Sequence, residues 1–506
     1  MTKVPGLLHA TRTVMVGRAL GLLAAFGAFV TIAAAYGSSI DTDIYFCAYA
    51  VPYAFLVVAG AVLPQSLVPI YAKVAKSESD ASARRFASAS LNATTLALTA
   101  LALIGIAAAP GLARLAAPGL HADHVAEVER QLRWLMALVV FGGVANLAKG
   151  ILNARFVFFT PSLDTFASYA LVIAAVWIGA GRWGIWALVA GTIAGNLFRL
   201  VVMAPDLARV GWRPVLSHPR LRTWGMTLIP LAAGAIVFGA NFVLMRSLAS
   251  LSVEPHAVSH LGYAERLVMV PSELVAASLG AALLPAASAR HAAGERAAFA
   301  RITSSAIRAS LLFLIPAAAG IMSLSGPLVR LVYEHGEFGR AAARETASTL
   351  FWFAPILPGS AVLVVGPALF AMGRIRAVVV MWCAITGLTL AIGWALLGSM
   401  GVRGVALAYA AATLCVGVGG LVAFSRASAL RLGEVARSAA RMTIAAGLMA
   451  ALVTGGRALF EGAGWGTGKI ETAVEVAMLG FFGAAAYAIL MGLFGAPEWA
   501  EARRRL

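Results

Sequence analysis

Charged residues are scarce in this sequence. Asp, Glu, Lys and Arg make up only 12% of its 506 residues, whereas 61% are hydrophobic. Soluble domains usually contain about 25% charged residues. The composition therefore excludes a water-soluble protein of this length and indicates a chain that crosses a membrane many times. Since no water satisfies the backbone there, we expect an all-α integral membrane fold.

Acidic residues are scarcer still, at 22 against 39 basic ones, which leaves a net charge of +17. The basic residues lie in short loops between apolar segments, so they indicate membrane topology rather than a nucleic-acid partner. About 24 cations fall on the side of the N-terminus and about 11 on the other. We therefore predict a multi-pass membrane protein with both termini cytoplasmic. The tail Arg503–Arg505 either contacts anionic lipid headgroups or only anchors this topology.

Cysteine and catalytic motifs are also lacking. The three cysteines lie in apolar segments without metal-ligand spacing. The sequence contains no P-loop, HExxH or GxSxG motif. We therefore predict no enzymatic activity, no metal site and no cofactor. Without a nucleotide-binding domain, any transport would draw on an ion gradient, the membrane potential or a separate protein.

Long apolar segments dominate the chain. Fourteen are candidate membrane spans, each long enough to cross a bilayer or nearly so. Their approximate limits are 15–36, 44–71, 88–109, 131–152, 162–181, 184–204, 223–246, 257–284, 304–331, 347–370, 377–397, 401–424, 439–456 and 471–494. Short loops with Gly and Pro separate them, so we expect a helical bundle without a long linker.

The chain repeats itself after six spans. The sequence from Gly60 to Pro64 matches that from Gly280 to Pro285, and Leu112–Leu115 matches Leu328–Leu331. An even number of spans gives both halves the same orientation, so the repeat axis runs along the membrane normal with a cavity between two lobes. We predict an N-terminal lobe at 1–222, a C-terminal lobe at 223–430, and two further helices with the basic tail at 431–506.

The eighth span holds charges within an apolar helix. Glu265, Arg266 and Glu273 lie inside it with Pro271. An intramembrane ion is costly and marks a functional site by default. Arg266 and Glu273 are seven residues apart and share one helix face. This face predicts a pathway for a polar or anionic substrate, with Glu273 as a coupling residue, or else a structural ion bridge.

Two prolines lie inside predicted spans, and three further arginines lie near span ends. Pro52 and Pro271 each remove a helix hydrogen bond, so they either form hinges or cavity walls or serve packing alone. Arg18, Arg199 and Arg308 lie near predicted cytoplasmic helix ends. We expect their side chains to extend to the membrane surface.

Several motifs in order resemble the MurJ/MviN family. The eighth span has Tyr263-Ala264-Glu265-Arg266-Leu267 followed by Pro271-Ser272, and Glu334-His335-Gly336-Glu337-Phe338 resembles that family's next outer loop. Thr42-Asp43 with Pro52 resembles the second-helix region, and Gly150-Ile151-Leu152-Asn153 the end of the fourth helix. The count of fourteen spans also matches the family.

The resemblance implies a flippase for lipid II, the undecaprenyl-pyrophosphate-linked peptidoglycan precursor. Two six-helix lobes would alternate around a cationic cavity, and the last two helices would hold the lipid tail. It implies substrate contacts at Arg266 and Glu265, a role for Asp43 and a location in the bacterial cytoplasmic (inner) membrane. Arg18 and Asn153 are further candidate substrate contacts. Glu273, Asp43, Pro271 and Pro52 are candidates for gating or coupling, although Glu273 is absent from the usual family pattern. The implied partners are a lipid-linked glycan, membrane lipids and cell-wall synthesis proteins.

The sequence also departs from the family pattern. Ala24-Ala25 stands where the first helix of the family has Arg-Asp, Ala54–Val57 replaces paired basic residues, and Leu363 replaces a frequent lysine. The cavity is therefore less cationic than is usual for the family. Two alternatives follow: an exporter of another polyprenyl-linked oligosaccharide, or a pseudo-flippase scaffold that does not transport.

Overall fold

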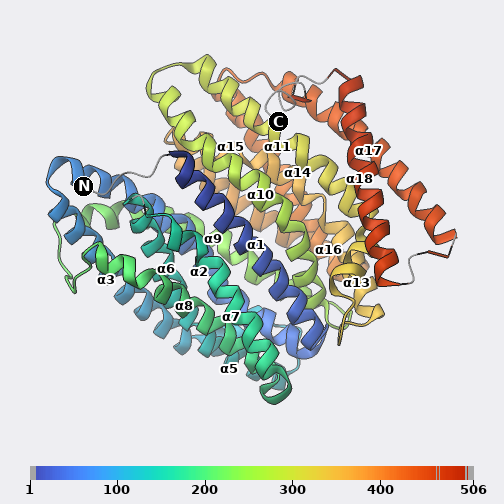
Figure 1. Cartoon of the computed structure of the whole chain (residues 1–506), viewed down its shortest axis with the longest axis horizontal. Coiled ribbons are helices and arrows are strands. Elements are labelled where there is room, and N and C mark those ends of the chain that lie inside the picture. Colours follow the sequence, from blue (N-terminus) through green and yellow to red (C-terminus); the bar gives the residue numbers. More distant parts are fainter. Residues whose placement is uncertain (1–6, 156, 463, 466–467, 496–497, 500–506) are drawn as a thin grey trace. The chain divides into compact units, whose positions relative to one another are not determined.

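A computed structural model describes residues 7–155, 157–462, 464–465, 468–495 and 498–499. These residues are almost entirely helical, and no β-strand occurs among them, as the sequence predicts. Contacts between residues divide the chain into two compact units, Met1–Leu251 and Ser252–Leu506. Figure 1 shows the helices of both units, coloured from blue at the N-terminus to red at the C-terminus.

The described residues of the first unit form nine helices. They are α1 Leu7–Tyr36, α2 Ile40–Ser77, α3 Asp80–Ala107, α4 Ala109–Ala116, α5 Ala122–Leu135, α6 Ala137–Ala154, α7 Phe159–Trp183, α8 Trp186–Arg209 and α9 Arg220–Ser250. Within this unit α1 packs along α7, α7 along α8, and α2 against both α6 and α9. The core lies where Leu67, Phe86 and Leu147 meet with no exposed surface.

The second unit also contains nine described helices. They are α10 Ala257–Ala292, α11 Arg296–Ser323, α12 Ser325–Tyr333, α13 Arg340–Phe353, α14 Ile356–Leu363, α15 Val365–Ala371, α16 Ile375–Ala427, α17 Leu432–Gly462 and α18 Lys469–Leu493. α10 packs against α11, α13 and α15, and α17 against α11 and α18. Figure 1 shows α17 and α18 as neighbouring red-to-orange helices.

Local sequence explains where the helices begin and break. Ser39 caps α2 with a reciprocal capping box to Thr42, and Asp41 and Asp43 lie in the positive first turn. In α16, Gly401 has φ 56°, a left-handed conformation that favours glycine, so two helices meet there at a kink.

The number of spans is close to the prediction. Twelve described helices are long and apolar enough to cross a membrane, or thirteen if Arg220–Ile229 and Gly234–Ser250, bent by 47°, form one span. α16 counts once in this total although predicted spans 377–397 and 401–424 both lie in it. The predicted total of fourteen is therefore not confirmed.

Some of the predicted divisions stay untested. α9 groups with the first unit, whereas the predicted lobe boundary at 222/223 precedes most of it. The division into two lobes and a C-terminal pair at 431–506 therefore remains a prediction. The basic tail Arg503–Arg505 lies outside the described residues.

Candidate functional site

The charged face predicted on α10 is present in the second unit. A guanidinium nitrogen of Arg266 lies 3.7 Å from a carboxylate oxygen of Glu273. The Arg266 side chain is 14% exposed and that of Glu273 is 42% exposed, so the pair reaches from the bundle interior toward an open surface. Pro271 lies inside the helix between them, and Glu265 is buried one residue before Arg266. The predicted pair is thus an ion pair along one helix face.

Aromatic packing fixes the first part of α10. The ring of Tyr263 contacts those of Tyr333 and Phe338, each at 5.1 Å between centroids. The Tyr333 hydroxyl donates to the backbone carbonyl of Tyr263 at 3.3 Å. All three rings are almost fully buried. The cluster joins the two stretches that carry the family resemblance and holds Arg266 one turn beyond Tyr263.

The predicted residues of the first unit lie on three helices, α1, α2 and α6. Arg18 is exposed on α1, and Asp43 is 3% exposed in the first turn of α2. Pro52 is buried inside α2, and Asn153 is half-buried at the end of α6. The favourable interaction of a carboxylate with the positive N-terminal end of α2 explains the place of Asp43 equally well.

The first unit contains a buried ion cluster that the sequence analysis missed. Asp164 on α7 has no exposed surface, and its carboxylate accepts hydrogen bonds from Lys149 on α6 at 2.9 Å and from Arg199 on α8 at 2.7 Å. Arg199 also donates to the side-chain oxygens of Asn146 at 2.8 Å and Asn196 at 3.2 Å. Two cations and one carboxylate leave this cluster with one positive charge.

The cluster corrects one prediction. The expectation that Arg199 extends to the membrane surface is wrong, because its side chain is only 13% exposed and its guanidinium binds a buried carboxylate. The signal was present in the sequence, since Asp164 is the only acidic residue in the predicted span 162–181. A carboxylate within a span requires a partner cation on a neighbouring helix.

These arrangements can bind an anion electrostatically. Among the described residues, no group of three or more His, Cys, Asp or Glu side chains is placed to hold a metal ion. Instead, each unit presents a partly buried arginine that a carboxylate orients, Arg199 in the first and Arg266 in the second. Such cations suit a phosphate or pyrophosphate group.

A family model described as "Lipid II flippase MurJ" matches residues 32–472. The chain belongs to the MurJ family. Membership makes it a multi-pass membrane protein of a transporter family rather than of a catalytic enzyme class. The family assignment made from Tyr263–Leu267 and the other motifs is thereby confirmed.

Members of the MurJ family are about a quarter identical to this chain over the residues that align. The lipid II flippase MurJ of Burkholderia cenocepacia is 26% identical over 68% of this chain and 69% of its own length. The probable lipid II flippase MurJ of Rhizobium meliloti is 26% identical over 61% of this chain and 59% of its own length. The alignments thus cover about three fifths to two thirds of these relatives.

Solved structures share the fold. A structure of lipid II flippase MurJ in an inward closed conformation covers 96% of this chain and 98% of its own, with a TM-score of 0.78 and 20% identity. An inward-facing multidrug resistance MATE family transporter of the MOP superfamily covers 79% of this chain and 92% of its own, with a TM-score of 0.69 and 14% identity. The MurJ-type helical fold predicted from sequence is therefore confirmed.

Proposed function

We propose that this protein translocates lipid II from the inner to the outer leaflet by alternating access. The match of residues 32–472 to the MurJ family supports this function most strongly. The charge arrangement is compatible with it, because a pyrophosphate that enters a bilayer needs fixed cations. Arg266 and the cluster of Lys149 and Arg199 supply such cations despite the alanines at 24–25 and 54.

The proposed site comprises the predicted residues together with the new cluster. Arg266 is the candidate phosphate ligand on α10, with Arg18, Glu265 and Asn153 as further substrate contacts. Glu273, Asp43, Pro271 and Pro52 remain candidates for gating or coupling. This role places the protein in the bacterial inner membrane with both termini cytoplasmic, beside the cell-wall synthesis proteins that make and use the same substrate.

Complementation tests the function directly. The protein is expressed in cells depleted of their own lipid II flippase, and lipid II on the outer face of the cytoplasmic membrane is measured. We expect exposure to be restored. No exposure, with the protein shown to be inserted, would overturn the proposal and favour another polyprenyl-linked oligosaccharide as cargo or a scaffold that does not transport.

A further inference from the structure

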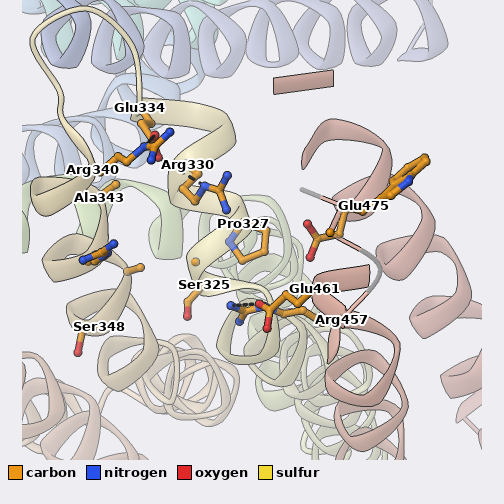
Figure 2. A pocket seen from close by; sticks show the side chains of 15 residues that line it. Ser325, Pro327, Arg330, Glu334, Arg340, Ala343, Ser348, Arg457, Glu461 and Glu475 are labelled. Carbon is orange, nitrogen blue, oxygen red and sulfur yellow. Dashed lines mark hydrogen bonds and ion pairs between the residues drawn. The ribbon is translucent and has the colours of Figure 1, made fainter. Parts of the chain in front are cut away.

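A separate cavity lies among α12, α13, α17 and α18 of the second unit (Figure 2). Its volume is about 580 Å³, within the range of roughly 300–1,000 Å³ that is usual for small-ligand sites. Seven charged residues line it: Arg330, Arg340, Arg344, Arg457, Glu334, Glu461 and Glu475. This mixture of charges differs from the cationic groups considered for the flipped substrate.

Most of these charges are paired. The guanidinium groups of Arg330 and Arg340 each lie 3.5 Å from the Glu334 carboxylate. Arg457 binds Glu461 at 2.9 Å along the last turns of α17. Glu334 therefore forms ion pairs with two arginines. Not every other charged residue of the cavity has an ion-pair partner among the residues that the structure describes.

Glu475 and Arg344 are the two charged residues of the cavity that these ion pairs do not include. Glu475 is only 3% exposed, yet no hydrogen bond or ion pair joins its carboxylate to another described residue. Arg344 is exposed and likewise has no ion pair among the described residues. A carboxylate buried to this degree is costly unless a cation meets it. Arg457 and Arg330 act on the Glu475 carboxylate electrostatically without forming an ion pair with it. The cavity thus offers a ligand an exposed cation and a buried carboxylate that has no direct partner in the described part of the chain.

The carboxylate of Glu475 and the arginines of α12 and α13 lie on different sides of the cavity. In Figure 2, Glu475 on α18 and Arg330 on α12 point toward each other across the space between these helices. Arg340 and Arg344 belong to the neighbouring α13. A ligand that places an ammonium near Glu475 and an anionic group near α12 and α13 would pair with the charges on both sides of the cavity. Such a ligand is a small zwitterion.

The surroundings of the cavity indicate a lipid as the source of that zwitterion. Trp465 lines the cavity and is 45% exposed. Leu459 on α17 and Ile470 on α18, two helices that contribute residues to the cavity, are 77% and 81% exposed. Tryptophan is enriched at the membrane–water interface, and exposed aliphatic side chains suit acyl chains. We propose that the cavity binds the headgroup of phosphatidylethanolamine, with the ammonium at Glu475 and the phosphate at Arg344 and Arg330.

Lipid titration of the purified full-length protein tests this proposal. Native mass spectrometry in detergent would compare phosphatidylethanolamine, phosphatidylglycerol and phosphatidylcholine. Loss of a charge-assisted hydrogen bond weakens binding by at least about tenfold. We expect that loss for phosphatidylethanolamine in Glu475→Gln, and a smaller loss in Arg344→Gln. Arg431→Gln, which changes an 83% exposed arginine outside the cavity, should bind like the wild type.

Three results would overturn the proposal. One is equal retention of phosphatidylglycerol and phosphatidylethanolamine together with unchanged binding in Glu475→Gln. A second is equal retention of phosphatidylcholine, whose quaternary ammonium has no hydrogen to donate to Glu475. The third is equally tight binding of free phosphoethanolamine, which would exclude the lipid as source. Arg344→Gln keeps the test decisive if Glu475→Gln fails to fold, because Arg344 is exposed.

Discussion

At the scale of single residues, the first unit depends on a carboxylate that no water reaches. Asp164 is fully buried and neutralises part of the charge of Lys149 and Arg199. Because Arg199 is also nearly buried, loss of its partner leaves a cation without compensation. The cluster thus couples α6, α7 and α8, and its carboxylate is more important for stability than an exposed one.

Asp164→Asn should therefore destabilise the protein strongly. Breaking a buried pair costs about 3–5 kcal/mol, so we expect a clearly lower midpoint of thermal unfolding in detergent. The control is Asp41→Asn, which changes an exposed aspartate in the first turn of α2 and should have a small effect. Equal midpoints for the two variants would show that Asp164 does not stabilise the unit through its ion pairs.

The ion pair on α10 should affect transport rather than folding. Arg266→Ala removes the guanidinium that we assign to the pyrophosphate, so lipid II exposure should fall to background while the protein still inserts. Glu273→Gln keeps the size of the side chain and removes its charge. If Glu273 couples transport to an ion, this variant should change the ion dependence of lipid II exposure. Full activity in Arg266→Ala, or an unchanged ion dependence in Glu273→Gln, would refute the respective role.

At the scale of elements, His218 joins the first turn of α3 to the start of α9. Its Nδ1 accepts the backbone N–H of Arg220 at 3.2 Å, so its Nε2 carries the proton and donates to Ser82 at 3.1 Å. Burial and the nearby Arg85 and Arg220 lower the pKa of His218, although Glu78 opposes this shift. The folded protein therefore favours the neutral ring.

Lowering the pH should weaken the contact of His218 with Ser82 and Arg220 and so destabilise the protein. A group whose pKa is lower in the folded state stabilises the protein above its unfolded pKa and loses that effect as pH falls below it. The melting midpoint should thus drop between about pH 7.5 and pH 5.5, and His218→Gln should drop less over that range. Glu78 does not interfere, because the Ser82 hydroxyl and Arg220 lower its pKa further below this range. Equal slopes in wild type, His218→Gln and the exposed-site control His121→Gln would contradict this origin.

Close helix packing gives a second prediction at this scale. A Cβ atom at Gly239 on α9 would lie 2.7 Å from the carbonyl oxygen of Ala54 on α2, whereas one at Gly225 on the same helix would meet nothing within 4 Å. Gly239→Ala should therefore cost about 1–3 kcal/mol through overpacking. Gly225→Ala should be neutral or stabilising by up to about 1 kcal/mol through helix propensity. A higher melting midpoint for Gly239→Ala than for Gly225→Ala would exclude this close approach.

Apolar length was enough to predict most of these helices, because a bilayer admits few other structures. Apolar length could not predict where a span is interrupted and divided into shorter helices. The predicted span 347–370 extends over α13, α14 and α15. Pro355 and Pro358 lie near the boundary of α13 and α14, Pro367 lies just after that of α14 and α15, and a proline lacks the N–H that continues a helix. The pair of Arg266 and Glu273 followed from helix period, but the partners of Asp164 lie 15 and 35 residues away on other helices. Only tertiary packing brings them together.

At the scale of the whole molecule, the distribution of cations predicts which ends of the helices face the cytoplasm. Loops with many Lys and Arg stay on the cytoplasmic side, and this rule places Lys76 and Arg431 inside and Glu337 outside. All three positions are exposed. The same orientation places the cavity between α12 and α18 at the outer surface, since Glu337 lies in the connection between α12 and α13.

Cysteine labelling in intact cells tests this orientation. Cys47, Cys383 and Cys415 are first replaced by serine, because two of them are exposed. Single cysteines are then introduced as Lys76→Cys, Arg431→Cys and Glu337→Cys. A membrane-impermeant maleimide should label only Glu337→Cys until the cells are permeabilised, after which all three should react. Labelling of Lys76→Cys or Arg431→Cys in intact cells would invert the topology, and the inferred headgroup cavity would then face the cytoplasmic leaflet.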